Sequence, residues 1–364
     1  MNTIGERIKA TLFGESHGQL IGIVIDGIPS GINLNTSLID KRLEERRPKP
    51  GIGTTRVEKD EYEIVSGYYQ EKTTGAPLTI IIKNQDIDSS AYDNLKNTPR
   101  PSHADYPAFC KYLGYNDPRG GGVFSGRMTV LFVVLGAISE QLLEKAKITV
   151  ISHLLKIKHI NDTNFDQTSV NNEYAQNTTF GRFPVINSSI EPDIAELIEQ
   201  AKNNKDSLGG LIESAIVGLP AGLGEPLFSS IESRLSQLLF SIPGVKGIEF
   251  GSGFKFADMY GSEANDEYQY ENGRVVTDTN HNGGILGGLS TGMPIILRLA
   301  VKPTPSIGLP QRTVDLKSKA DTVIEIKGRH DPAIVLRVVP IVNALLNFGI
   351  LDLLCQFHEQ DWLR

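Results

Sequence analysis

The chain has 364 residues, with 36 lysines and arginines against 43 aspartates and glutamates, and a formal net charge of −7. Hydrophobic residues make up 40% of it and charged residues 22%, which is typical of a globular protein rather than a disordered one. The net negative charge argues against a general nucleic-acid binder. Two cysteines, Cys110 and Cys355, are too few for a disulfide framework and predict free thiols in a reducing compartment.

The first residues do not follow the pattern of a secretory signal, because Glu6, Arg7 and Lys9 interrupt them. The longest apolar run, residues 130–138, is about half of the ~20 residues that a membrane-spanning helix needs. These features predict a cytoplasmic protein whose partners include neither a membrane nor a nucleic acid.

The first half of the chain predicts two strands and two helices. Residues 21–32 (IGIVIDGIPSGI) have the pattern of a strand that ends in a Gly/Pro turn. A helix over residues 38–47 follows, capped by Asn35 or Thr36 and stopped by Pro48. A TGAP turn then leads into the apolar strand LTIIIKN, and an apolar helix is expected over residues 128–145.

The second half repeats this order. Residues 212–223 (IESAIVGLPAGL) predict a strand and turn, Glu225-Pro226 opens a helix over residues 227–241, a TGMP turn precedes the strand IILRLAVKP, and residues 333–354 predict a second apolar helix. Two different matches in the same order indicate an internal repeat. The chain is therefore interpreted as a single unit, residues 1–364, with halves of about 1–205 and 206–364. Both apolar helices lack a polar face, which predicts that they are buried between sheets.

Glycine is in excess, 36 of 364 residues, and groups at residues 14–22, 120–126 and 283–288. Glycine allows positive φ and close approach of a ligand, so these groups predict ordered binding loops. Four of the seven histidines, namely His17, His103, His281 and His330, lie in Gly-, Arg- or Asp-rich segments, where binding residues usually occur. The histidine and cysteine spacings match no metal motif, and no metal site is expected.

One short motif fits a different enzyme class. Residues 14–18 read GESHG, which matches the G-x-S-x-G nucleophile elbow and makes a serine hydrolase built on Ser16 an alternative. That elbow requires a helix after the serine, whereas a strand and turn are predicted here. The basic residues point to another ligand class, because several arginines stand beside Gly or Pro turns and favour an anionic ligand; they are Arg46, Arg47, Arg100, Arg119, Arg127 and Arg329.

Six motifs together resemble a known family. FGESHG, RPSHADY, GGGVFSGR, HNGGILGG, KPTPSI and KGRHDP occur in the order found in chorismate synthases, and the resemblance runs from residue 3 to about residue 350. It implies an α+β fold, a β-α-β sandwich with an internal pseudo-two-fold repeat, assembled as a homotetramer. It also implies a lyase that converts 5-enolpyruvylshikimate 3-phosphate to chorismate and phosphate by anti-1,4-elimination with reduced FMN, the last common step of the shikimate pathway to aromatic amino acids.

The resemblance assigns roles to individual residues. His17 is implied as the acid toward the departing phosphate, His103 as the group that protonates the reduced flavin, and Asp331 as the base on the N5 side of the flavin. Substrate binding falls to Ser16, Arg46 and Arg47. The implied FMN-binding residues are Phe124, Ser125, Gly126, Arg127, Gly287, Lys302, Pro303, Thr304, Pro305, Ser306 and Arg329. Val123 and Ile52 stand where many members of the family have basic residues.

The source of the reducing equivalents stays open at this point. The glycine groups match neither a dinucleotide fingerprint nor a phosphate loop, so an external flavin reductase is favoured over reduction by NADPH on the chain itself. The remaining non-enzymatic alternative is a flavin-binding module used for storage or sensing. Such a module requires no acid or base among its loops, whereas this chain places two histidines and an aspartate there.

Overall fold

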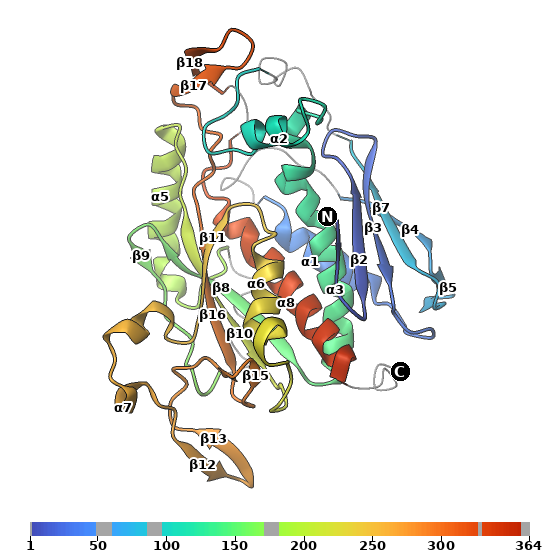
Figure 1. Ribbon diagram of the computed structural model, residues 1–364, viewed down its shortest axis with the longest axis vertical. Helices are drawn as coiled ribbons and strands as arrows, with labels where there is room; N and C mark the ends of the chain where they lie inside the picture. Colours follow the sequence, from blue (N-terminus) through green and yellow to red (C-terminus); the bar gives the residue numbers. More distant parts are fainter. Residues whose placement is uncertain (1, 49–59, 86–96, 171–181, 327–329, 358–364) are drawn as a thin grey trace.

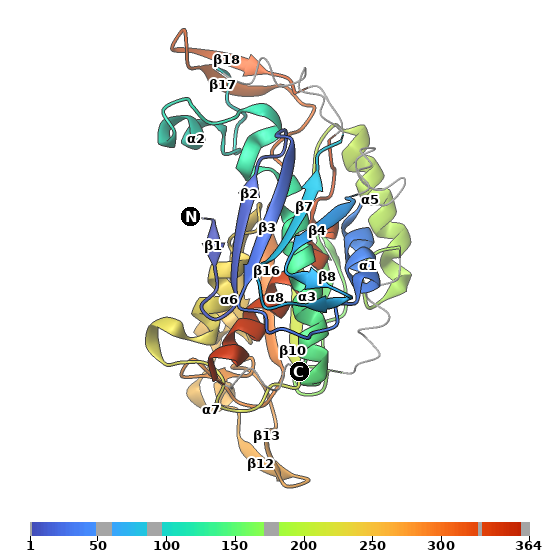
Figure 2. The ribbon, with the colours of Figure 1, turned by 90° about the vertical axis from the view of Figure 1, so that its right-hand side faces the viewer.

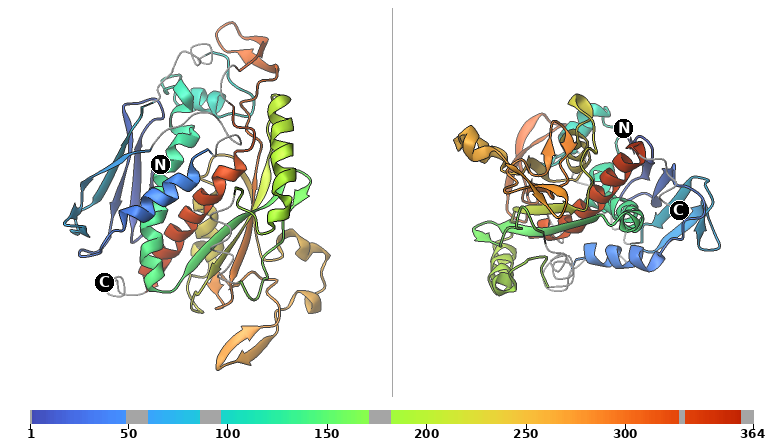
Figure 3. Two further views of the ribbon diagram at one scale, coloured as in Figure 1. Left: turned by 180° about the vertical axis from the view of Figure 1, so that it is seen from behind. Right: turned by 90° about the horizontal axis from the view of Figure 1, so that it is seen from below.

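The computed structural model describes residues 2–48, 60–85, 97–170, 182–326 and 330–357. Helices lie in a layer between two antiparallel sheets of five strands each (Figure 1). Figure 3 shows the same layers from behind and from below. The predicted α+β fold, a β-α-β sandwich with two buried helices between antiparallel sheets, is confirmed.

One sheet is formed by strands before α3 (Thr129–Lys145) and the other by strands after it. The first has the order β1 (Thr3–Ile4), β2 (Lys9–Gly14), β3 (Leu20–Asp26), β7 (Leu78–Lys83) and β4 (Tyr62–Ser66). The second has the order β11 (Val245–Phe250), β16 (Ile295–Val301), β10 (Gly210–Val217), β8 (Thr149–Ile157) and β9 (Ile160–Asn161). On β7 the side chains of Leu78, Ile80 and Ile82 alternate with more exposed ones, so one face of the first sheet packs on the helices.

The two sheets are related by the internal repeat. In the first, β3 pairs with β2 and β7, and β7 pairs with β4. In the second, β10 pairs with β8 and β16, and β16 pairs with β11. In the internal repeat, β3 is therefore the equivalent of β10, and β7 is the equivalent of β16. Because β8 and β9 belong to the second sheet, the sheets divide the chain between residues 145 and 149, earlier than the expected boundary near residue 205.

Three of the four predicted helices lie within two or three residues of their expected bounds. α1 spans Thr36–Arg46, and the side chain of Asn35 caps it by accepting the N–H of Leu38 at 3.2 Å. α3 spans Thr129–Lys145 after a short 3₁₀ turn, Gly126–Met128. α8 spans Val335–Phe357.

The fourth predicted helix begins later than expected. Leu227–Ser229 is a 3₁₀ turn with Leu227 at a φ of 62°, and α6 spans Ile231–Leu239. Ser230 caps α6 by accepting the N–H of Ser233 at 3.1 Å. Glu225-Pro226 therefore opens a turn and not the helix, and Ser230 satisfies one of the free N–H groups at the start of the helix.

α3 and α8 pack against each other at the centre of the molecule. A Cβ atom on Gly136 would lie 2.2 Å from the Cα of Ala344, so glycine is required for this close approach. By length and composition both Gly126–Lys145 and Val335–Phe357 are long and apolar enough to cross a membrane. The uninterrupted apolar run at residues 130–138 is shorter than either helix and does not indicate this. In the structure 72% and 89% of their apolar windows are buried inside the protein, as in the core helices of a folded domain.

The remaining elements lie around this sandwich. Two hairpins project from its opposite ends in Figure 2, β12–β13 at one end and β17–β18 at the other. The elements outside the two large sheets and the central helices are α2 (Asp105–Lys111), α5 (Glu191–Asn203), α7 (Gly261–Ala264), β5 (Tyr68–Tyr69), β6 (Lys72–Thr73), β12 (Tyr268–Glu271), β13 (Arg274–Thr277), β14 (Ile285–Leu286), β15 (Leu289–Ser290), β17 (Gln311–Asp315) and β18 (Ala320–Ile324).

The outer face of the second sheet carries a row of charged side chains. His153, Glu213, Arg298 and Glu249 are register partners across β8, β10, β16 and β11. The Nε of Arg298 donates to Glu249 at 2.7 Å. His153 is fully buried, with Nδ1 3.0 Å from Asp162 Oδ2 and Nε2 3.2 Å from Glu213 Oε2. The imidazole therefore ties the segment that follows β9 to the sheet.

We expect this histidine to make the stability of the fold depend on pH. Burial by itself lowers the pKa of His153, but the hydrogen bonds and charges of Asp162 and Glu213 outweigh it and raise the pKa. Its contribution to stability is thus complete below about pH 6.5, the ordinary histidine value, and is lost as pH rises through the folded-state value. At pH 6, His153→Gln should lower the free energy of unfolding by roughly 3 kcal/mol.

Urea unfolding of wild type and variant between pH 6 and 9 measures this effect. The difference between the two proteins should shrink as the pH rises. His159→Gln is the matched control, because His159 lies on the surface near the end of the same strand and should leave the profile unchanged. A His153→Gln profile parallel to that of the wild type would contradict the expectation.

Candidate active site

The loop between β2 and β3 carries Ser16 and His17, each with 3% of its surface exposed. Asn84 directly follows β7, the neighbour of β3, and its Nδ2 donates to the carbonyl oxygens of Glu15 at 3.0 Å and Gly18 at 2.9 Å. The loop that presents His17 is therefore held by the pairing of the first sheet.

This described loop lacks the strand-to-helix turn of a nucleophile elbow. β2 and β3 pair as antiparallel neighbours on either side of it, so a strand follows Ser16 where the hydrolase alternative needs a helix. The hydroxyl of Ser16 donates to the carbonyl oxygen of Arg119 at 3.4 Å. The geometry gives no support to a hydrolase built on Ser16.

The glycine segment at residues 120–122 lies against both predicted catalytic histidines. All three glycines have positive φ, at 59°, 88° and 54°. A Cβ atom on Gly120 would lie 2.4 Å from Nε2 of His17, and one on Gly121 would lie 3.5 Å from Nε2 of His103. Neighbouring Cα atoms are about 3.8 Å apart, so adjacent residues of one segment contact both imidazoles. The segment needs glycine because a side chain at Gly120 would displace the His17 ring.

His103 belongs to a compact ionic cluster at the start of α2. Its Nδ1 lies 2.6 Å from Oδ1 of Asp105. The guanidinium of Arg100 donates to both oxygens of that carboxylate, at 2.7 and 2.8 Å. Burial by itself raises the pKa of Asp105, but the hydrogen bonds from Arg100 and His103 outweigh it and hold this pKa well below its ordinary value. Asp105 is therefore ionised at neutral pH.

The segment after β16, residues 302–306, joins this cluster from the second half of the chain. The Nζ of Lys302 donates to the carbonyl oxygen of Ser102 at 2.6 Å, and Nη1 of Arg100 donates to Ser306 Oγ at 3.3 Å. The buried Oγ1 of Thr304 has no hydrogen-bond partner among the residues that the structure describes. This hydroxyl is available to a ligand. The two halves of the chain therefore meet at one site.

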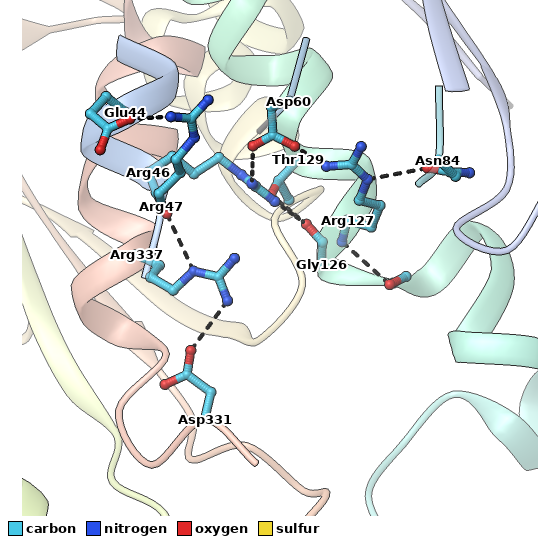
Figure 4. A network of polar contacts seen from close by, with 11 residues as sticks. Glu44, Arg46, Arg47, Asp60, Asn84, Gly126, Arg127, Thr129, Asp331 and Arg337 are labelled. Atoms are coloured by element: carbon cyan, nitrogen blue, oxygen red, sulfur yellow. Dashed lines mark hydrogen bonds and ion pairs between the residues drawn. The ribbon is translucent and has the colours of Figure 1, made fainter. Parts of the chain in front are cut away.

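Arg46, at the end of α1, and Arg127, just before α3, converge on the buried carboxylate of Asp60 (Figure 4). Arg127 forms a close ion pair with Asp60, while Nη1 of Arg46 lies 3.6 Å from its other oxygen. Arg46 is 4% exposed and also donates to Thr129 Oγ1 at 3.1 Å and to the carbonyl of Gly126 at 2.9 Å. Paired guanidinium groups of this kind suit a phosphate or carboxylate.

Arg127 connects this cluster to the loop of His17. Its Nε donates to Oδ1 of Asn84 at 3.2 Å, the residue whose amide holds that loop. Its backbone N–H donates to Ser125 Oγ at 3.3 Å, so Ser125 caps the turn that opens into α3. The contacts of Arg127 and Asn84 thus connect the arginine cluster to the loop that carries His17.

Asp331 lies at the other end of the network in Figure 4. It is 9% exposed, and its Oδ1 accepts the N–H of Ala333 at 3.1 Å, which caps the turn before α8. Its Oδ2 accepts from Nη1 of Arg337 at 3.2 Å, and Nε of Arg337 donates to the carbonyl of Arg46 at 3.3 Å. Asp331 therefore has both a capping contact and a connection to the arginine cluster.

The structure does not bring Gly287 to this site. Gly287 lies in the β14–β15 hairpin, whose Gly284 approaches the carbonyl of Pro294 directly before β16. Lys302 directly follows the other end of that strand. A seven-residue strand is about 23 Å long at 3.3 Å per residue, so hairpin and site lie at opposite ends of β16.

Some predicted residues have weaker support from the geometry. Arg47 forms a close ion pair with Glu44 near the surface. Phe124 and Val123 are 37% and 42% exposed, next to the buried glycines. Arg329 and Ile52 lie outside the described residues.

Sequence reasoning missed several residues that hold the site together. Asn84 and Asp60 have no motif around them, because their role depends on contacts with residues far away in the chain. Arg337 lies within α8, which the sequence pattern predicts only as an apolar buried helix. Asp105 lies in the RPSHADY motif, but its contact with His103 is visible only in the structure.

Residues 8–355 match the sequence profile of a family described as chorismate synthase. The chain belongs to the chorismate synthase family. Chorismate synthases from Pyrococcus abyssi and Thermococcus gammatolerans are 46% and 45% identical to it over 354 and 352 residues, with 96% of this chain and 96% of each relative covered. A solved structure described as a crystal structure of chorismate synthase superposes with a TM-score of 0.77 at 25% identity, covering 97% of this chain and 93% of the other.

Family membership makes the chain an enzyme, a lyase of the shikimate pathway and of aromatic biosynthesis that acts on a small molecule. Within the described ranges, no group of three or more His, Cys, Asp and Glu side chains could hold a metal ion.

Proposed function

We propose that this member of the family converts 5-enolpyruvylshikimate 3-phosphate to chorismate and phosphate by anti-1,4-elimination, with reduced FMN as its cofactor. The observation that carries the proposal is the contact of residues 120–122 with both His17 and His103. Asn84 connects the loop of His17 to Arg127. An elimination of phosphate requires an acid for the departing group, cations that hold it, and a base for the hydrogen that is lost. The roles proposed for His17, the arginines and Asp331 would supply these groups.

The described residues fit a phosphorylated flavin. Thr304 has a buried hydroxyl that a ligand can satisfy, and Arg127 places a guanidinium at the turn before α3. We propose that FMN is bound by Phe124, Ser125, Gly126, Arg127, Lys302, Pro303, Thr304, Pro305, Ser306 and Arg329, and not by Gly287, which lies at the opposite end of β16. When bound, reduced FMN supplies an electron-rich ring system that assists the departure of the phosphate.

The protein's own groups hold the protons and the substrate. His17 carries on its imidazole the proton for the departing phosphate, and its burial beside Gly120 keeps this proton from bulk water. His103 holds a proton on the other side of the glycine segment. Asp331 is the carboxylate that takes up a proton. We propose that Ser16, Arg46 and Arg47 bind the substrate.

An external flavin reductase is proposed to supply the reduced cofactor. Free cysteines, Cys110 and Cys355, are consistent with the reducing cytoplasm in which we place the reaction. Burial raises the pKa of Cys355 to about 12, so this thiol stays protonated and unreactive. The alternative of a storage module for flavin predicts binding without phosphate release.

The deciding experiment is anaerobic incubation with 5-enolpyruvylshikimate 3-phosphate and photoreduced FMN. We expect release of one phosphate for each chorismate formed. Oxidised FMN should give no turnover, and NADPH with oxidised FMN should give turnover only after a flavin reductase is added. Binding of reduced FMN without phosphate release would favour the storage module, and turnover with NADPH alone would remove the need for an external reductase.

We also propose that the chain assembles as a homotetramer. The apolar strands β7 and β16 are interior strands of their sheets, so pairing between their edges does not support assembly. The support comes from large apolar side chains on the surface, with Leu227, Phe228 and Phe254 exposed by 81%, 93% and 84%. Light scattering at micromolar concentration should give the mass of four chains, and a monomeric mass would contradict the proposal.

A further inference from the structure

We propose that Asp105 is a positioning residue that keeps a proton on Nδ1 of His103, so that Nε2 is the atom through which His103 gives and takes protons. The proposal rests on the proposed function in taking His103 as a residue of the reaction. It adds a residue to which the sequence motifs assign no role.

The short contact determines which nitrogen carries the proton. Nδ1 of His103 lies 2.6 Å from Oδ1 of Asp105 and 3.1 Å from Nη2 of Arg100. A guanidinium donates only and an ionised carboxylate accepts only, so Nδ1 cannot satisfy both neighbours. Nη2 of Arg100 already donates to Oδ1 of Asp105 at 2.8 Å. The proton therefore lies on Nδ1 and is donated to the carboxylate.

The carboxylate is held firmly enough to orient the ring. Arg100 is 7% exposed and contacts Asp105 with its Nε, its Nη2 and its backbone N–H, at 2.7, 2.8 and 3.0 Å. Its remaining guanidinium nitrogen, Nη1, donates to Ser306 of the opposite half. An aspartate with three donors from one buried arginine has a fixed position, and the imidazole bonded to it is fixed as well.

The opposite side of the ring faces the glycine segment. A Cβ atom on Gly121 would lie 3.3 Å from Cε1 and 3.5 Å from Nε2 of His103. Because Gly121 has no side chain, space remains beside Nε2 where any other residue would place a Cβ atom. Nε2 therefore points into the same site as His17, while Nδ1 is bonded to the protein.

Nitrogen NMR on the ¹⁵N-labelled full-length protein without cofactor tests this directly. The His103 signals are assigned by their loss in His103→Gln. In the wild type, Nε2 should be the nitrogen that loses its proton as the pH is raised. In Asp105→Asn, Nδ1 should lose it instead, because Nη2 of Arg100 can then donate to that nitrogen. Asp117→Asn removes a neighbouring carboxylate that pairs with Arg119 and should leave the His103 protons unchanged.

Loss of the proton from Nδ1 in the wild type would overturn the proposal, and so would an unchanged pattern in folded Asp105→Asn. If that variant does not fold, the wild-type spectrum alone still decides the question. Turnover of Asp105→Asn should fall by roughly 10²-fold, at the lower end of the range for general acid–base groups. A wild-type enzyme that releases no phosphate would refute the proposed function and leave the NMR result standing.

Discussion

Replacing His17 by alanine should lower turnover by roughly 10²–10⁴-fold, the usual contribution of a general acid. The imidazole is 3% exposed and packs against Gly120, so no water molecule in bulk exchange can substitute for its proton at the same position. FMN affinity should stay nearly intact, because Arg127 and residues 302–306 are unchanged. Steady-state phosphate release and a flavin titration measure the two quantities.

His159→Ala is the matched control for this variant, since it removes a surface imidazole far along the second sheet. It should retain wild-type turnover. A second histidine variant separates the roles on either side of the glycine segment: His103→Ala should lower turnover and also change the absorption spectrum of bound reduced FMN, which His17→Ala should not. Full turnover of His17→Ala would leave the histidine with a structural role.

Asp331→Asn should lower turnover by roughly 10²-fold or more while leaving the melting temperature near that of the wild type. The capping contact survives, because the carbonyl oxygen of asparagine can accept the N–H of Ala333 as Oδ1 now does. Asparagine cannot take up a proton as a base. Affinities for FMN and for 5-enolpyruvylshikimate 3-phosphate should also be retained.

The ion pair with Arg337 provides the control for this experiment. Arg337→Met breaks the same contact at 3.2 Å but keeps the carboxylate of Asp331. If the carboxylate acts as a base, Arg337→Met should retain much more activity than Asp331→Asn. Equal losses in the two variants would show that the ion pair matters and the proton does not, and unchanged turnover of Asp331→Asn would exclude Asp331 from the mechanism.

Local sequence patterns were sufficient to predict the central strands and helices of the fold. The apolar runs that become β3, β7, β10 and β16 are interior strands, and their periodicity reports burial on one or both faces. The two apolar helices were correctly expected to be buried, because a helix without a polar face has no stable place on a surface. The cap of α1 at Asn35 was also readable, since capping depends on residues a few positions apart.

Local sequence patterns did not predict the first residue of α6 or the point in the chain at which the second sheet begins. Glu225-Pro226 is a good helix opening in isolation, but Ser230 provides the cap in the folded chain. β8 precedes the predicted boundary and yet pairs with β10, because sheet membership is decided by hydrogen bonding to a distant strand. The pairing of β8 leaves no signal in the residues around it, whereas Ser230 is an ordinary N-cap residue that competes locally with Glu225-Pro226 as the start of the helix.

The sequence by itself determined the family, since six motifs occur in a fixed order, and those motifs contain His17, His103, Asp331 and some of the arginines for which roles are proposed. The tertiary structure decided how they act on one another. Residues 120–122 contact both histidines, Oδ1 of Asp105 lies 2.6 Å from Nδ1 of His103, and Asp60 joins Arg46 to Arg127. It also left Gly287 at the far end of β16 from Lys302. The reason is physical: motif residues are local in the chain, whereas hydrogen bonds, close approach and separation depend on how the two sheets pack around α3 and α8.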